Sequence, residues 1–113
     1  MKPFSKDIGI IHFIGIGGIG MSGIAEILCN LGYKISGSDI NKSSNVNRLI
    51  EMGIKVHIGQ RAGNIKNVSI IVISSAIPED NVELVAGALN KIPIVRRADM
   101  LAELMRFKKS ISV

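Results

Sequence analysis

The sequence predicts a doubly wound α/β fold, built on a mainly parallel, five-stranded sheet with the strand order 3-2-1-4-5. Short runs of β-branched residues alternate with stretches whose apolar residues recur at helical spacing, and two of these stretches end at a glycine. Strands that alternate with helices pair in parallel through right-handed crossovers, so helices are expected on both faces of the sheet. The length fits one domain spanning residues 1–113.

The first half of the chain contains the clearest local signals. Gly32 and Gly53 each follow a stretch of helical spacing, where a left-handed cap favours glycine. Ser43 or Ser44 can cap the start of the second helix. In order, the expected elements are a strand at 8–16, a helix with Ile24, Ile27, Leu28 and Leu31 on one face, a strand at 34–38, a helix with Val46, Leu49 and Ile50, and a strand at 54–58.

The second half continues the alternation. Asp80 and Glu83 have the spacing of a capping box, and Asp99 can cap the last helix. The expected elements are a polar loop or short helical turn at 60–67, a strand at 68–73, a helix with Val82, Val85, Ala88 and Leu89, a strand at 93–95, a helix with Leu101, Leu104 and Met105 facing inward, and the start of a strand at 110–113. Because the sequence stops inside that apolar strand, we expect a fragment of a longer protein.

Composition narrows the class of protein. Cys29 is the single cysteine and fits a reducing, cytoplasmic compartment. The net charge of +5 favours anionic partners, but the basic residues are scattered and lack an aromatic platform, so no nucleic-acid partner is expected. The most apolar stretch, residues 10–28, contains five glycines and Glu26, a poor composition for a membrane span.

The main chemical signal is a glycine-rich loop between the first expected strand and helix. Gly15, Gly17 and Gly20 fit the pattern G-x-G-x-x-G, and Gly18 adds a further glycine. In this context Gly15 permits a tight turn, Gly17 and Gly18 let backbone amides approach a ligand, and Gly20 lets the helix pack closely. Amides at a helix start suit a diphosphate. The alternative is a turn that serves only strand–helix packing.

An acidic residue follows at the end of the second expected strand. Asp39 lies 19 residues after Gly20, and a carboxylate at that position accepts hydrogen bonds from ribose hydroxyls and disfavours a 2′-phosphate. A turn or helix-capping aspartate is the alternative. A nucleoside diphosphate is therefore the leading ligand, with its base, and its role as cofactor or substrate, left open.

Other polar residues are expected at the same sheet edge, where ligands of such sheets bind. Ser74, Ser75 and Ala76 follow the fourth strand and could border a base or ribose, or form a plain polar turn. Arg96 and Arg97 follow the fifth strand and could contact phosphate, or form a solvated basic corner. His12 is expected to be a satisfied core or edge histidine rather than a catalytic one.

Four segments resemble a known family. Residues 12–26, which include the glycine loop, closely resemble the start of the Mur ligases, and residues 37–39, 74–77 and 96–106 are also similar. The resemblance runs from His12 to the end of the chain. The Arg-Arg-Ala-Asp-Met sequence from Arg96 argues against the family member that recycles murein tripeptide.

The resemblance implies a Rossmann-like first domain of a three-domain cytoplasmic ligase of bacterial peptidoglycan synthesis. That enzyme joins L-alanine to the lactyl carboxylate of UDP-N-acetylmuramic acid through an acyl phosphate, using ATP and Mg²⁺. This chain has no G-x-x-x-x-G-K-[ST] motif, and the family's ATP loop, central domain and C-terminal domain would come later. Residues 1–113 are therefore expected to bind the UDP-sugar without a cofactor or metal and to catalyse nothing alone.

The resemblance also suggests which residues contact the substrate. The diphosphate would meet Gly17, Gly18, Ile19 and Gly20, the uridine would meet Ser38, Asp39 and residues 74–77, and Arg96 and Arg97 carry over less directly. Two alternatives use the same loop and acid: an NAD-binding domain of an oxidoreductase, and a nucleotide-sensing module without enzymatic activity.

Overall fold

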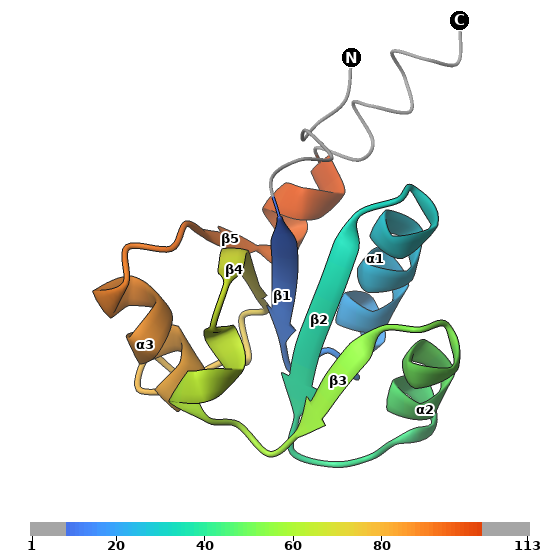
Figure 1. The fold of residues 1–113 in the computed structure, drawn as a ribbon, viewed down its shortest axis with the longest axis horizontal. Helices are drawn as coiled ribbons and strands as arrows, with labels where there is room; N and C mark the ends of the chain where they lie inside the picture. The colour runs from blue at the N-terminus through green and yellow to red at the C-terminus, as the bar shows by residue number, and fades with distance from the viewer. Residues whose placement is uncertain (1–8, 103–113) are drawn as a thin grey trace, which may run out of the picture.

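The computed structural model describes residues 9–102 and contains a five-stranded parallel sheet in the order β3-β2-β1-β4-β5 (Figure 1). This confirms the predicted fold class and strand order. The strands are β1 (Ile10–Ile14), β2 (Lys34–Asp39), β3 (Lys55–Ile58), β4 (Val68–Ile73) and β5 (Ile94–Arg96). The helices are α1 (Ile19–Asn30), α2 (Ser44–Glu51), the 3₁₀ helix η2 (Ala62–Ile65) and α3 (Val82–Leu89), with a further helical stretch at 97–102.

Helices cover both faces of the sheet and create two apolar cores. Helices α1 and α2 lie on one side of the sheet and α3 lies on the other (Figure 1). Ile11 and Phe13 of β1 contribute to the core beneath α1 and α2, and Met100 of the last helical stretch is buried in that same core. Ile14 contributes to the second core, beneath η2 and α3. Consecutive side chains of β1 thus alternate between the two faces, as strand geometry requires.

The predicted helix ends are confirmed for α1 and α2. The hydroxyl of Ser43 accepts a hydrogen bond from the backbone amide of Val46, so Ser43 rather than Ser44 is the N-cap of α2. Gly32 and Gly53 have φ angles of +99° and +94°, in the left-handed region that favours glycine. The expected short turn within 60–67 is η2.

The expected capping box at the start of α3 is wrong. Asn81 is the N-cap, because its side chain accepts from the amides of Glu83 and Leu84; Asp80 therefore forms no capping box with Glu83. The buried residues of α3 are Glu83 and Gly87. The apolar residues expected to define this helix are instead exposed: Val82, Val85, Ala88 and Leu89.

Smaller differences affect the other helices. Asp99 lies inside the last helical stretch instead of capping it, and Leu101 is exposed whereas its neighbour Met100 is buried. Ile27 and Ile50 are also more exposed than their spacing indicated. The predictions for Ile8, Leu104, Met105 and residues 110–113 lie outside the described residues. Within residues 9–102 no helix is both long and apolar enough to span a membrane.

Gly23 offers a simple test of helix propensity in α1. A Cβ added to this residue would meet no atom within 4 Å. We expect Gly23→Ala to raise the free energy of unfolding by about 0.5–1 kcal/mol, because glycine inside a helix is destabilising by roughly that amount relative to alanine. Chemical denaturation monitored by circular dichroism measures the change, and a destabilised variant would contradict the open space at this position.

Candidate functional site

The last two residues of β2 hold the first part of the glycine loop. The backbone carbonyl of Ser38 accepts hydrogen bonds from the amides of Gly15 and Ile16, both at 2.9 Å. One carboxylate oxygen of Asp39, Oδ2, accepts from the amide of Gly17 at 2.8 Å. Three consecutive amides of the loop are therefore fixed by the end of the neighbouring strand.

The amides that remain open belong to the first turn of α1. The amide of Gly18 donates to the carbonyl of Gly15, and within residues 9–102 nothing accepts from the amides of Ile19, Gly20 and Met21. Gly18 is the N-cap and provides no side-chain cap. The amides of Gly17 and Gly18 are therefore both occupied by acceptors within the chain. The open donors, with the positive end of the helix dipole, begin one residue later.

Asp39 has structural partners of its own. Besides the bond from Gly17, its other carboxylate oxygen accepts from the amides of Ile40 and Asn41, at 2.8 and 3.3 Å. A carboxylate has room for about four hydrogen bonds, so three are used and one position is left for a ligand hydroxyl. Asp39 thus has the turn role that the sequence offered as one alternative, and its remaining acceptor position is compatible with the other.

Two other sheet-edge residues lie against the loop. The side chain of Arg97 crosses Gly20, since a Cβ at Gly20 would lie 2.8 Å from its Cδ and 3.0 Å from its Nε. Ile77 reaches Gly15, whose added Cβ would lie 3.3 Å from its Cδ1. The structure therefore brings a guanidinium, and the loop after β4, next to the open turn of α1.

The remaining predicted residues occupy the surroundings. The hydroxyl of Ser74 accepts from the amide of Ala76 at 3.3 Å, and Ser75 and Ala76 are exposed. Arg96 is an exposed residue at the end of β5. The Ser38 side chain is fully buried, so the structure places it beneath the loop rather than at the surface.

The start of α2 adds a contact that the sequence reasoning missed. The side-chain amide of Asn45 donates to the carbonyl of Gly17 at 3.1 Å. A Cβ on Gly17 would lie 2.8 Å from Oδ2 of Asp39 and 3.0 Å from Oγ of Ser43. Gly17 is therefore required by close packing on both sides, a fact that the glycine spacing indicated without naming its neighbours.

A buried carboxylate lies under the same sheet edge, on the face covered by α3. The Oε1 atom of Glu83 accepts from Nε2 of His12 and from the hydroxyl of Ser38, both at 2.7 Å. Its Oε2 atom accepts from the amide of Arg61 at 3.1 Å and from the side chain of Asn64 at 2.8 Å. Four donors from β1, β2, η2 and the residue before η2 thus fill this carboxylate completely.

His12 is a satisfied core histidine, as expected. It is fully buried, and its second ring nitrogen, Nδ1, lies 2.8 Å from the hydroxyl of Ser36. Both ring nitrogens of His12 therefore have a hydrogen-bond partner, Glu83 at Nε2 and Ser36 at Nδ1. The ring of His57 lies nearby, with its centroid 6.5 Å from that of His12.

The surroundings shift two pKa values in this cluster. Burial raises the pKa of Glu83, but the hydrogen bonds from His12, Ser38 and Asn64 outweigh burial, and the pKa lies below its ordinary value. Burial, then the charge of Lys55 and the proximity of His12, lower the pKa of His57. Both shifts make the folded state bind protons less readily than the unfolded chain.

Acidification should therefore destabilise the fold in two stages. Because the pKa of His57 is lowered, its contribution to the free energy of unfolding is fully present above the ordinary value of 6.5. This contribution declines as the pH falls below 6.5. The lowered pKa of Glu83 gives stability that is present above 4.5 and is lost as the pH falls through the folded-state pKa. Denaturation curves from pH 8 to about pH 2 cover both stages. His57→Gln should remove the stage near pH 6.5, and an unchanged pH profile in that variant would contradict the assignment.

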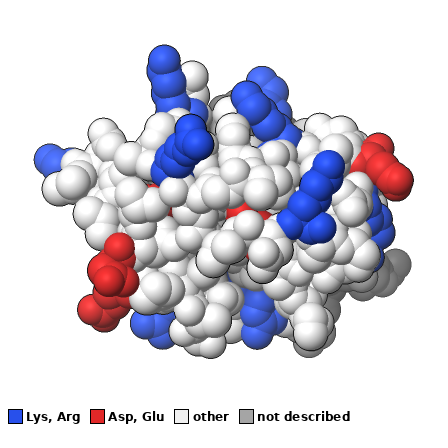
Figure 2. Space-filling view, turned by 90° about the horizontal axis from the view of Figure 1, so that it is seen from below, with Lys and Arg blue, Asp and Glu red and all other residues white. Residues whose placement is uncertain are grey.

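Charged side chains are dispersed over the face of the molecule at which the strands end and the glycine loop begins. Figure 2 shows the face seen from below, toward which β1, β2 and β3 point in Figure 1, and its Lys and Arg side chains are spread out rather than gathered into one patch. An ion pair between Arg48 and Glu26, at 3.7 Å, links α2 to α1 at the surface. Among the described residues on this face (Figure 2), the Lys and Arg side chains form no continuous basic strip of the kind that binds nucleic acid.

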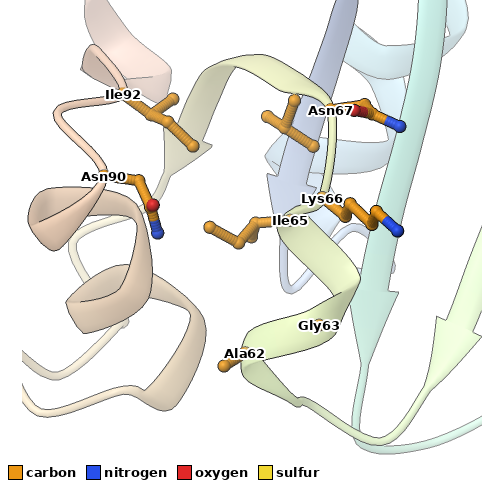
Figure 3. Close-up of a pocket in the computed structure, with 8 residues that line it drawn as sticks. Ala62, Gly63, Ile65, Lys66, Asn67, Asn90 and Ile92 are labelled. Carbon is orange, nitrogen blue, oxygen red and sulfur yellow. The ribbon is translucent and has the colours of Figure 1, made fainter.

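A hollow of about 530 Å³ lies elsewhere, between η2, the start of β4 and the end of α3 (Figure 3). It is adjacent to the amino end of β4, whereas the glycine loop follows the carboxyl end of β1. None of the predicted site residues lines it. The lining residues are Ala62, Gly63, Ile65, Lys66, Asn67, Val68, Asn90 and Ile92.

A parallel sheet with a glycine loop after its first strand, and an acid at the end of the adjacent strand, defines a Rossmann-like α/β domain. Residues 10–109 match the family described as "Mur ligase family, catalytic domain". The chain therefore belongs to the Mur ligase family.

Individual relatives agree with this assignment. The chain is 59% identical over 108 residues to a UDP-N-acetylmuramate–L-alanine ligase of Rhodopseudomonas palustris, an alignment that covers 96% of this chain and 23% of that protein. The crystal structure of UDP-N-acetylmuramate-alanine ligase from Thermotoga maritima matches with a TM-score of 0.86 and 30% identity, over 89% of this chain and 24% of that one. A murein peptide ligase from Psychrobacter arcticus shares the fold, with a TM-score of 0.75 and 21% identity over 84% of this chain and 20% of its own. The chain spans about a quarter of the length of the curated relatives it matches.

Proposed function

We propose that this chain is the UDP-N-acetylmuramate-binding domain of an ATP-dependent ligase that adds L-alanine to that substrate in peptidoglycan synthesis. The observation that supports it best is the uncapped first turn of α1, with open amides at Ile19, Gly20 and Met21 beside Arg97. Its relatives named UDP-N-acetylmuramate–L-alanine ligase indicate the substrate class.

The diphosphate would bind at that turn. Open amides at a helix start form charge-assisted hydrogen bonds with phosphate oxygens. Gly17, Gly18 and Gly20 lack the side chains that would obstruct this approach, and Arg97 adds a positive charge beside Gly20.

The uridine would lie along the ends of β2 and β4. The fourth acceptor position of Asp39 suits a ribose hydroxyl, and Ser74, Ser75 and Ala76 border the same edge. Ser38 would act from beneath the loop, through its carbonyl. Arg96 would be available for a more distant part of the ligand.

The chemical step would belong to other parts of the protein. Within residues 9–102, no group of three or more His, Cys, Asp or Glu side chains could hold a metal ion. The sequence also has no G-x-x-x-x-G-K-[ST] motif, the usual phosphate loop for ATP. We propose that ATP, Mg²⁺ and L-alanine are bound outside this chain, in a cytoplasmic enzyme, and that the chain alone binds substrate without turning it over.

Titration with UDP-N-acetylmuramic acid tests the proposed function. In two-dimensional NMR spectra, we expect saturable shifts for the amides of Ile19, Gly20 and Met21, and smaller shifts along the 74–77 loop. NAD provides the comparison, because the same loop and acid occur in NAD-binding domains. Shifts at α1 with NAD but not with the UDP-sugar would contradict the proposal.

A pair of variants separates specific binding from general charge attraction. Arg97→Met should weaken binding about tenfold, as expected when a charge-assisted hydrogen bond of about 1.5 kcal/mol is lost. Lys66→Met removes the same charge from the hollow at the other edge of the sheet and should leave the affinity unchanged. Equal losses in both variants would indicate nonspecific attraction.

A further inference from the structure

We propose that Glu83 is a positioning residue for the nucleotide loop, and that it acts through Ser38. This inference rests on the proposed function for its consequence in binding, but its geometry is visible without a ligand. The hydroxyl of Ser38 donates to Glu83 at 2.7 Å, while the carbonyl of the same residue accepts from the amides of Gly15 and Ile16. One residue therefore links the buried carboxylate of α3 to the first turn of the glycine loop.

The position of Ser38 makes this link direct. Ser38 is the penultimate residue of β2 and pairs with Ile14, the last residue of β1. Its side chain reaches the α3 face of the sheet, where Glu83 fixes it, and its carbonyl lies at the sheet edge, where the loop begins. Because the next residue, Asp39, holds Gly17, a displacement at Ser38 would move the acceptors of the Gly15, Ile16 and Gly17 amides.

The hydrogen-bonding capacity of Glu83 explains why a carboxylate is present at this position. Glu83 is fully buried, and a buried charge is less favourable for stability than well-packed apolar side chains. What a carboxylate adds is four acceptor positions, all occupied here by donors from separate parts of the chain. It thereby fixes the mutual placement of β1, β2 and η2 at the edge where the loop begins, a task that an apolar side chain would not perform.

Two serines of the same strand provide a matched pair for the first test. Ser36 and Ser38 are both buried in the polar cluster, but only the carbonyl of Ser38 holds the loop. In the ligand-free chain we expect Ser38→Ala and Glu83→Gln to speed hydrogen exchange of the Gly15 and Ile16 amides at least tenfold relative to amides inside α1. Ser36→Ala should change that ratio less than twofold. Unchanged protection in both Ser38→Ala and Glu83→Gln would overturn the proposal.

Binding provides the second test. For UDP-N-acetylmuramic acid, measured by calorimetry at a temperature where each variant is folded, we expect Kd to rise about tenfold in Ser38→Ala and in Glu83→Gln, and less than twofold in Ser36→Ala. The double variant should bind no more weakly than the weaker single variant, since both changes break one linkage.

The outcomes distinguish the two proposals. Normal binding by the wild type together with normal binding by folded Glu83→Gln and Ser38→Ala would overturn the positioning role and leave the proposed function intact. Absence of binding by the wild type would count against the proposed function, while the exchange ratios would still decide whether Glu83 holds the loop.

Discussion

Replacement of Glu83 by alanine is expected to lower the free energy of unfolding by at least about 3 kcal/mol, because each buried donor left without its acceptor costs about 1–3 kcal/mol. The loss is large because His12, Ser38, Asn64 and the amide of Arg61 would keep their donors but lose their shared acceptor. Small domains have only about 5–15 kcal/mol of stability, so the variant should unfold at a much lower concentration of urea.

Glu79 provides the control for this prediction. It is exposed in the loop before α3 and carries the same charge. Glu79→Ala should change the free energy of unfolding by less than about 0.5 kcal/mol. If Glu83→Ala and Glu79→Ala have the same urea midpoint, the carboxylate does not have the central structural place that its four hydrogen bonds indicate.

Replacement of Gly37 by alanine is expected to cost about 1–3 kcal/mol, the usual penalty for overpacking a core. A Cβ at Gly37 would lie 2.5 Å from Cδ1 and 2.7 Å from Cβ of Ile16. A new rotamer of Ile16 cannot relieve the second contact, and Ile16 is fully buried. Since Ile16 belongs to the glycine loop, the backbone shift that relieves the clash should also weaken binding of the UDP-sugar.

Gly63→Ala is the matched control, because a Cβ at Gly63 would meet nothing within 4 Å. Thermal or urea denaturation compares the two variants, and calorimetry compares their affinities. A Gly37→Ala variant as stable as Gly63→Ala would show that β2 and the loop can separate at little cost.

The fold was predictable because its signals are local. The β-branched run at 68–73 gave β4 with its observed bounds, and the left-handed glycines Gly32 and Gly53 ended α1 and α2 where expected. Alternation of strands and helices then leaves few topologies, since parallel crossovers are right-handed. The observed strand order is one of the common orders of doubly wound sheets.

The face of α3 was not predictable from the pattern of apolar residues. Val82, Val85 and Leu89 are apolar but exposed, whereas Glu83 and Gly87 face the sheet. Core residues are mostly apolar, but an apolar residue need not lie in the core, because much of any protein surface is also apolar. A buried glutamate becomes favourable only when its donors are known, and these lie far from it in the sequence.

The site was predictable only where its signals are local in the sequence. The glycine spacing and Asp39 identified the corner between β1, α1 and β2, and the structure joins them through the bond from the Gly17 amide. The occupation of the Gly17 amide depends on the end of β2, and the approach of Arg97 depends on how β5 joins the sheet. Such contacts are set by tertiary packing, which spacing alone does not encode.

The shared carboxylate also has a consequence for how the chain matures during synthesis. The donors of Glu83 lie in β1, β2, η2 and the residue before η2, which leave the ribosome first, whereas their acceptor arrives only with α3. A nascent chain that ends before α3 would leave His12 and Ser38 without their shared acceptor. This polar cluster can therefore be completed only after residue 83 has emerged from the ribosome.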